Sequence, residues 1–175
     1  MQRDLSRRQQ TGTPLLFYGS DQPYFEFTNA ASYPITFRGQ IYPTAEHLYN
    51  ARKFLDGAPN LAERIRNARS PRTAIDESIR LQKFQRADWS SIKISVMEEV
   101  LEAKFTQHSI LRSLLLGTGD RELIDTSPLS AFWGIGKDGL GRNELGKILM
   151  RLRQRLRNGL AAEGPPPPPP AEGLR

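Results

Sequence analysis

The pattern of hydrophobic and polar positions divides the chain into a strand-like beginning and a helical remainder. The segments LLFYGS (15–20) and ITFRGQIYPT (35–44) are rich in β-branched and aromatic residues and contain glycine turns, which is typical of strands. Within the second segment, FRGQIY predicts a short hairpin over 36–42. After Pro43 the pattern becomes helical, with Thr44 placed as an N-cap.

The helical pattern predicts a mostly helical α+β domain with a small β-sheet near its N-terminus. The chain of 175 residues is long enough for one domain with a real core. We expect this domain over 15–159, between a disordered leader at 1–14 and a disordered proline-rich tail at 160–175. The expected helices cover 45–56, 59–68, 71–80, 89–107, 108–116, 120–124 and 143–157.

The two ends of the chain carry no targeting or membrane signal. The leader is polar and lacks the apolar region of a secretory signal, and no apolar run approaches the roughly 20 residues that span a bilayer. The run PPPPPP (165–170) predicts a polyproline II tail, which is either inert or bound by a profilin, SH3 or WW domain. The missing secretory signal and the absence of cysteine together favour an intracellular, cytoplasmic protein.

Composition excludes several kinds of site. Without cysteine the chain has no disulfide, no thiolate nucleophile and no cysteine-ligated zinc. Two histidines do not make a three-histidine metal site. The net charge is +6, and five basic residues without an acid lie in 145–157. This cluster suits phosphate, nucleic acid or an acidic partner, or it is only a solvated helix face.

The helix expected from Trp89 carries two lysines on its apolar face. At 100° per residue, Lys93 and Lys104 share an arc with Trp89 and four aliphatic or methionine side chains. A buried ammonium group is costly without a partner. The two lysines therefore either snorkel outward or meet an anion, such as a phosphate or the carboxylate of Glu46.

The stretch PTAEHLYNARK (43–53) places a carboxylate beside a histidine at a helix start. Glu46, Asn50 and Lys53 share one helix face. Glu46 either stabilises the positive helix N-terminus or acts as a general base or acid near lysines. His47 either packs at the helix start or belongs to the same site.

Five glycines fall within 134–146, just before the last expected helix, with Asn143 as its N-cap. Gly134, Gly136 and Gly139 spell G-x-G-x-x-G, but no convincing strand precedes them, which excludes a Rossmann site. The loop is either a phosphate cradle or a plain connection. Trp133 is either a stacking platform for a base or part of the core. Together these features predict one site for a phosphorylated nucleoside-like ligand.

Several stretches match a known family in order and spacing. The chain resembles the YbiA-like, or NADAR, family of N-glycosidases over about 16–157. The matching stretches are FYGS (17–20), FEFTNA (25–30), YPTAEHLYNARKF (42–54), LLLGTGDRELID (114–125) and FWGIGKDGLGRNELGKILMRLR (132–153).

The resemblance implies hydrolysis of the N-glycosidic bond of a riboside or ribosylamine phosphate, without metal or organic cofactor. Its substrate classes are the ribosylaminopyrimidine intermediates of riboflavin synthesis and ADP-ribose conjugates, including ADP-ribosyl-guanine in a nucleotide or in DNA. We take a small phosphorylated riboside as the expected partner and the ADP-ribose conjugates as the alternative.

The resemblance also implies roles for individual residues. Glu46 matches the family's acidic residue, and Trp89 and Trp133 match its pocket tryptophans. Lys53, Lys93, Lys104 and Asn143 match family positions that we assign to phosphate or ribose, and Asn29 lies in a family motif. His47, beside Glu46, and Gly134 and Gly136, in the glycine-rich loop, complete the expected binding residues.

One position departs from the family pattern. Ser130 stands where the family usually has an aspartate, three residues before the Trp-Gly pair. Either the enzyme is slowed or altered in substrate, or the domain binds ADP-ribose or a nucleotide without turnover. Asp125 and Asp138 are the acids close enough in sequence to compensate.

Overall fold

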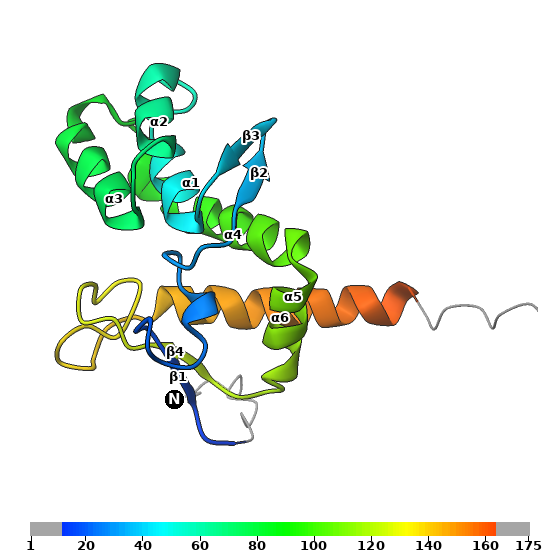
Figure 1. Cartoon of the computed structure of the whole chain (residues 1–175). Helices are drawn as coiled ribbons and strands as arrows, with labels where there is room; N and C mark the ends of the chain where they lie inside the picture. Colours follow the sequence, from blue (N-terminus) through cyan, green and yellow to red (C-terminus); the bar gives the residue numbers. More distant parts are fainter. Residues whose placement is uncertain (1–11, 164–175) are drawn as a thin grey trace, which may run out of the picture.

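The fold is seen in a computed structural model that describes residues 12–163 (Figure 1). In this part of the chain the strands are β1 (Leu15–Phe17), β2 (Ile35–Phe37), β3 (Gln40–Tyr42) and β4 (Leu123–Asp125). The helices are α1 (Ala45–Ala51), α2 (Pro59–Arg66), α3 (Pro71–Arg80), α4 (Trp89–Gln107), α5 (Ser109–Gly117) and α6 (Glu144–Glu163). Two short 3₁₀ turns, η1 (Phe25–Phe27) and η2 (Gln82–Phe84), complete the described elements. The mostly helical α+β fold is confirmed.

The strands form two separate two-stranded sheets in the described residues. Strands β2 and β3 pair antiparallel, and Arg38 and Gly39 between them both have positive φ, which suits a tight hairpin turn. The predicted hairpin is therefore confirmed. Strands β1 and β4 pair in parallel although more than a hundred residues separate them, with Leu15 opposite Leu123.

The helix expected over 120–124 is wrong, because residues 123–125 form β4. A short apolar run is compatible with a helix or a strand. Here, pairing with the distant strand β1 makes it a strand. Other boundaries differ less. Helix α1 ends at Ala51 instead of 56, since the chain continues in turns, and α6 continues to Glu163.

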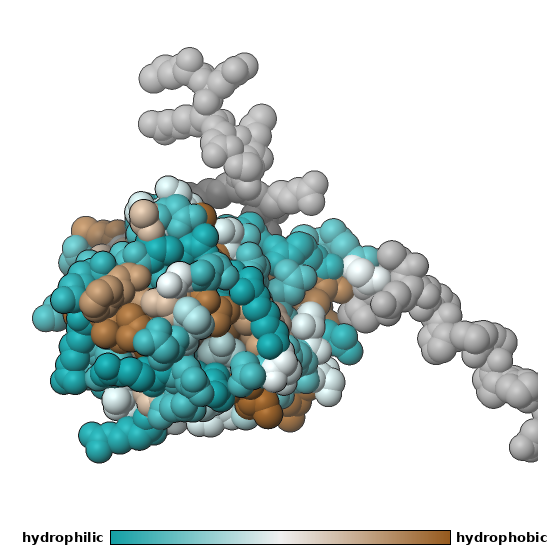
Figure 2. Space-filling model, turned by 90° about the horizontal axis from the view of Figure 1, so that it is seen from above, coloured by the Kyte–Doolittle hydropathy of each residue, from teal (hydrophilic) through white to brown (hydrophobic). Residues whose placement is uncertain are grey.

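Helix α4 lies between two layers of the molecule. Helices α1–α3 and the β2–β3 hairpin lie above it in Figure 1, and α6 with the β1–β4 pair lies below. Its apolar side chains are accordingly buried on more than one side, among them Val96, Met97, Val100, Leu101 and Phe105. The face seen from above is mostly hydrophilic with separate hydrophobic patches (Figure 2).

The basic residues of α6 are compensated by partners from other elements. Arg151 pairs with Glu98, and Arg155 pairs with Glu102, both on α4. Arg153 is buried and donates to the Thr118 hydroxyl at 2.7 Å. The other two basic residues of this run, Lys147 and Arg157, pair with Glu144 and Asp120. The cluster of charge seen in the sequence is therefore not a surface of unpaired cations.

Little of the predicted leader and tail lies within the described residues. The expected leader and proline-rich tail fall largely on residues 1–11 and 164–175, which lie outside the described residues. Next to the first of these, the Thr13 carbonyl accepts a hydrogen bond from Arg121 at 2.9 Å. Within 12–163, no helix has the length and apolar character that crossing a membrane requires.

Close packing of α6 on β4 predicts that Gly146→Ala destabilises the fold. A Cβ at this position would collide with the Leu123 carbonyl oxygen and with the Asn143 amide. We expect a loss of about 1–3 kcal/mol in the free energy of unfolding, measured by denaturant titration. Gly159→Ala on the same helix meets no atom within 4 Å and should stabilise by up to about 1 kcal/mol. Equal stability of the two variants would contradict this packing.

Candidate functional site

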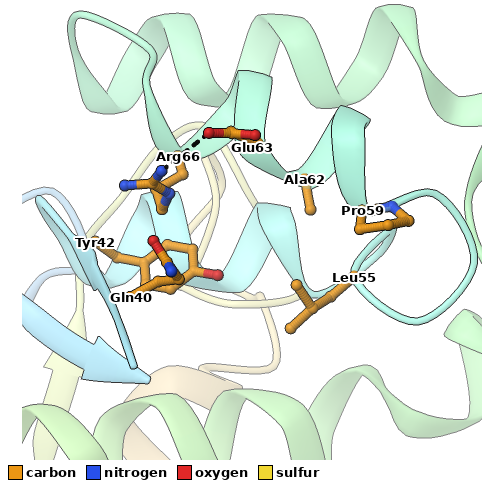
Figure 3. Close-up of a pocket in the computed structure, with 7 residues that line it drawn as sticks. All are labelled: Gln40, Tyr42, Leu55, Pro59, Ala62, Glu63 and Arg66. Atoms are coloured by element: carbon orange, nitrogen blue, oxygen red, sulfur yellow. Dashed lines mark hydrogen bonds and ion pairs between the residues drawn. The ribbon is translucent and has the colours of Figure 1, made fainter. Parts of the chain in front are cut away.

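A cavity of about 670 Å³ opens between α1, α3 and the loop that follows β4. Its size lies within the usual range for small-molecule sites. A second pocket of about 200 Å³ lies between the β2–β3 hairpin and α2, where the Arg66–Glu63 ion pair is the main polar feature (Figure 3). The larger cavity carries many more converging polar groups. They are Tyr18, Thr28, Asn29, Glu46, Tyr49, Asn50, Lys53, Arg72, Asp125, Ser127 and Ser130.

Glu46 enters this cavity from the first turn of α1. Thr44 is the N-cap, as predicted, and its hydroxyl accepts from the His47 N–H. The Glu46 N–H donates to the Asn29 carbonyl at 2.9 Å, which fixes the start of the helix against the preceding segment. Burial raises the pKa of Glu46, whereas the Asn50 hydrogen bond and the charge of Lys53 oppose that rise.

The predicted face of α1 forms one hydrogen-bonded row. The Asn50 amide donates to Glu46 Oε1 at 2.8 Å, and Lys53 Nζ donates to Asn50 Oδ1 at 2.8 Å. Lys53 also donates to the Ser78 hydroxyl at 2.7 Å. Burial lowers the pKa of Lys53 to about 8, against the opposing charge of Glu46. The cavity therefore holds a carboxylate and an ammonium group joined through one amide.

The two tryptophans do not face each other directly. Trp133 lines the cavity, while Trp89 is buried and is not among the lining residues. Tyr49 lies between them, with ring centroids 5.1 Å from Trp89 and 5.6 Å from Trp133. We did not predict Tyr49 as a site residue, although its position three residues after Glu46 in α1 was a usable signal. Burial raises its pKa.

Asn29 presents an unsatisfied acceptor at the cavity. Its side chain is buried and lines the cavity, and Oδ1 has no hydrogen-bond partner within the described part of the chain. Its Nδ2 has only the Met97 sulfur at 3.3 Å. Leaving a buried acceptor unpaired costs about 1–3 kcal/mol, so this oxygen suits a ligand that brings a donor.

Asp125 is a second carboxyl group in the same cavity. It is the last residue of β4 and is only 5% exposed. Burial raises the pKa of Asp125 to about 6, although the Ser127 N–H donates to Oδ1 at 2.9 Å and opposes the rise. Asp138, the other acid considered from sequence, is exposed, accepts from the Leu140 N–H and does not line the cavity.

Asn143 acts on the backbone of β4 and does not line the cavity. Its Oδ1 accepts from the Asp125 N–H, and its Nδ2 donates to the Leu123 carbonyl, both at 2.9 Å. The side chain thus makes hydrogen bonds to the β4 backbone of the kind that a neighbouring strand would make. The backbone of Asn143 itself has φ +51. Asn143, which we predicted as a helix N-cap and a ligand contact, instead uses its side chain to position Asp125.

Three other predicted residues lie outside the cavity lining. His47 is buried, with Nδ1 2.8 Å from the Thr44 hydroxyl and Nε2 3.0 Å from the Ala68 carbonyl, and burial lowers its pKa. Lys93 lies over the Phe132 ring at 3.9 Å from its centroid. The third residue is Lys104, which is fully buried. Neither nitrogen of the His47 ring is free for a ligand.

Lys104 neither snorkels outward nor meets an anion. It is 0% exposed, and its ammonium donates to the carbonyls of Glu26 and Thr28 at 2.6 and 2.7 Å. Burial lowers its pKa to about 7. Since the two carbonyls belong to the segment that leads into Asn29, Lys104 positions a cavity residue from behind.

The glycine-rich loop uses its N–H groups internally, which corrects the expectation of a phosphate cradle. The N–H groups of Gly134, Gly136, Gly139 and Gly141 all donate to loop carbonyls. At Gly134 a side chain would collide with the Asp125 carbonyl, and Gly136 has φ +68. These glycines permit close packing of the loop, and neither Gly134 nor Gly136 lines the cavity.

Ser130 lines the cavity and closes a turn. Its hydroxyl oxygen accepts from the N–H groups of Phe132 and Trp133, at 3.3 and 3.0 Å. The side chain therefore sets where the Trp133 ring enters the cavity. Across the described residues, no group of three or more histidine or acidic side chains is placed to hold a metal ion.

The contacts of Lys104 predict a large stability loss for Lys104→Met. The change removes the donor of the Glu26 carbonyl and leaves the Thr28 carbonyl with the Ala31 N–H at 3.4 Å, at a cost of about 1–3 kcal/mol for each lost hydrogen bond. Lys93→Met on the same helix removes a lysine that makes only a contact with an aromatic ring, and we expect a loss of at most about 1 kcal/mol. Denaturant unfolding measures both. Similar losses for the two variants would contradict the role of Lys104.

Comparison with known proteins agrees with the resemblance seen in the motifs. The model of the NADAR domain matches residues 16–157. N-glycosidase YbiA of Escherichia coli (strain K12) is 41% identical over 144 residues, which is 82% of this chain and 89% of that protein. Riboflavin biosynthesis protein VVA0006 of Vibrio vulnificus is 41% identical over 143 residues, and the match spans 82% of this chain but 38% of that longer protein.

A solved structure shows the same fold. The NMR structure of Escherichia coli YbiA superposes with a TM-score of 0.80 at 38% sequence identity, covering 89% of this chain and 91% of that one. The family model, the relatives and the fold agree over nearly the whole described region, and the chain belongs to the NADAR domain family.

Proposed function

We propose that the cavity hydrolyses the C1′–N bond of a phosphorylated ribosylamine of the ribosylaminopyrimidine type. The enzyme class, an N-glycosidase, follows from membership of the family and from relatives of that name. The finer choice of substrate draws support from the relative named as a riboflavin biosynthesis protein. The observation that carries the proposal is Glu46 in a cavity that Trp133 lines, with its backbone N–H bonded to the Asn29 carbonyl and its carboxylate bonded to the Asn50 amide.

Glu46 acts on the ribose carbon. As the C1′–N bond breaks, positive charge develops on the sugar ring, as in other glycoside cleavage. A carboxylate beside C1′ stabilises that charge and then takes a proton from the attacking water. Burial raises the pKa of Glu46, and the Asn50 amide and the Lys53 ammonium oppose that rise and favour the ionised form that this role requires.

Other cavity groups suit the rest of the substrate. The Trp133 ring offers a stacking surface for a planar base. The unpaired Asn29 Oδ1 suits a ribose hydroxyl, which is a hydrogen-bond donor. Lys53 and Arg72 are the lysine and arginine that line the cavity, and they suit the phosphate. Binding energy from the phosphate would align C1′ with Glu46.

An ADP-ribose conjugate of guanine is the second candidate, and the open side of the cavity favours it. Two lining residues there, Leu129 and Ile79, are 72% and 61% exposed, so a larger ligand is able to extend past them. A panel of both substrate types, with released base measured by mass spectrometry, separates the two candidates.

The role of Glu46 predicts that Glu46→Gln abolishes turnover but spares binding. The amide keeps the shape of the carboxyl group but neither stabilises the sugar cation nor accepts the proton of water. We expect kcat to fall about 1,000-fold while the Kd of ribose 5-phosphate changes little. Glu63→Gln, at an exposed ion pair on α2, is the matched control. Wild-type turnover by Glu46→Gln would remove Glu46 from the mechanism.

The contacts of Ser130 predict that Ser130→Asp changes kcat/KM little. An aspartate there would accept the same two N–H groups that the serine accepts, so the Trp133 turn is kept. The comparison is made on the ribosylaminopyrimidine 5′-phosphate. A gain of about 100-fold, typical of an added general acid, would instead show that the natural chain lacks a catalytic acid.

A further inference from the structure

We propose that Asp125 is the general acid that protonates the departing nitrogen, opposite in role to Glu46. This inference rests on the N-glycosidase function proposed above and adds a catalytic residue to it. The bases and amines of ribosylamine substrates leave poorly as anions. The reaction therefore calls for a second carboxyl group in the cavity, because Glu46 does not protonate the leaving nitrogen.

The geometry holds one oxygen of Asp125 and leaves the other open. The backbone N–H of Asp125 donates to the Asn143 side chain, its carbonyl accepts from the Ile135 N–H, and Oδ1 accepts from the Ser127 N–H, each at 2.9 Å. No residue in 12–163 donates a hydrogen bond to Oδ2. Asp125 nevertheless lines the cavity, and Oδ2 is not among the buried polar atoms without a partner.

Gly134 makes this placement of Asp125 possible. A Cβ at Gly134 would lie 2.8 Å from the Asp125 carbonyl oxygen and 3.1 Å from its Cγ. The glycine-rich loop is therefore packed directly on this carboxyl group. Gly134 permits this packing on Asp125, whereas Gly136 packs against Ala131.

The two carboxyl groups lie in different electrostatic surroundings, which favour different protonation states. Glu46 accepts from an amide and lies near the Lys53 ammonium, whereas Asp125 makes no ion pair with any described residue. Burial raises the pKa of both groups, but the nearby Lys53 ammonium favours the ionised form of Glu46 and has no counterpart beside Asp125, so the proposal places the proton on Asp125. Burial raises the pKa of Asp125 to about 6, in the direction that this division needs.

The other titratable groups around Asp125 do not change this division. In the cavity these are Tyr18, Tyr49 and Arg72, besides Glu46 and Lys53. On α6, Glu144 accepts from Arg142 and Lys147 and is engaged there. The residues of β1, which pairs with β4, carry no charge.

The proposed step is balanced by water. The electron pair of the C1′–N bond goes to the nitrogen, which takes the proton from Asp125. Water then adds its oxygen to C1′ and gives one proton to Glu46. The products are the free amine or base and the ribose phosphate. Release of the proton from Glu46 and uptake of one by Asp125 restore the enzyme.

The position of the acid also accounts for the serine at 130. The Ser130 hydroxyl oxygen accepts the hydrogen bonds of the turn that holds Trp133. With the acid supplied from the end of β4, a carboxyl group at 130 is not needed for proton transfer.

Asp125→Asn tests the proposal on the full chain with ribosylaminopyrimidine 5′-phosphate as substrate. The amide oxygen still accepts from the Ser127 N–H, so the loop keeps its anchor. We expect kcat/KM to fall about 100-fold or more. In the wild-type protein, kcat/KM should decline as the pH rises through about 6, because the acid loses its proton, and the variant should lack that decline.

Asp138→Asn is the matched control, since Asp138 belongs to the same loop but is exposed and outside the cavity. It should keep the wild-type rate and pH profile. A folded Asp125→Asn with wild-type rate overturns the role of Asp125 and leaves the N-glycosidase function intact. A wild-type protein that releases no base from any ribosylamine or ADP-ribose conjugate overturns the proposed function, and the role of Asp125 with it.

If Asp125→Asn does not fold, the wild-type pH profile decides. A decline centred near pH 6 supports the proposal. A flat profile to pH 7, or a decline only near pH 8 where the pKa of Lys53 lies, overturns it.

Discussion

The arrangement of the site depends on how one irregular segment is buried. Residues 26–29 run from the short η1 turn into an irregular stretch, so several of their carbonyl groups need donors from elsewhere. Lys104 supplies two of them and the Glu46 N–H supplies a third. The buried ammonium thus replaces the hydrogen bonds of a strand. This solution brings Asn29 and the first turn of α1 to the same cavity wall.

The cavity then combines groups from two layers that meet across α4. Helix α1 brings Glu46, the turns directly after it bring Lys53, and the segment from β4 through the glycine-rich loop brings Asp125 and Trp133. Each layer carries one carboxyl group in a different electrostatic setting. One lies beside a lysine and an amide, and the other has only a backbone N–H. Two acids of the same chemical kind are thereby suited to opposite proton-transfer roles.

Backbone packing explains the glycines and Asn143 better than ligand binding does. The glycine N–H groups close the loop on itself, and the Asn143 amide takes the place of a strand beside β4. Both features keep the end of the β1–β4 pair close to the start of α6. In the proposed function, phosphate binding then falls to Lys53, just after α1, and Arg72 on α3, which line the cavity.

Local pattern in the sequence determined the helices, the hairpin, the N-cap Thr44 and the row from Glu46 to Lys53, because each depends on residues a few positions apart. The motifs also identified the family. Strand β4, the burial of Lys104 and the membership of Tyr49 and Asp125 in the cavity were decided only by tertiary structure. Each of these depends on a partner far away in the chain, namely β1, the carbonyls of residues 26 and 28, Trp89 and Trp133, and the amide of Asn143. Short-range periodicity carries no information about such partners, which is why the same residue types allowed several interpretations before the chain was folded.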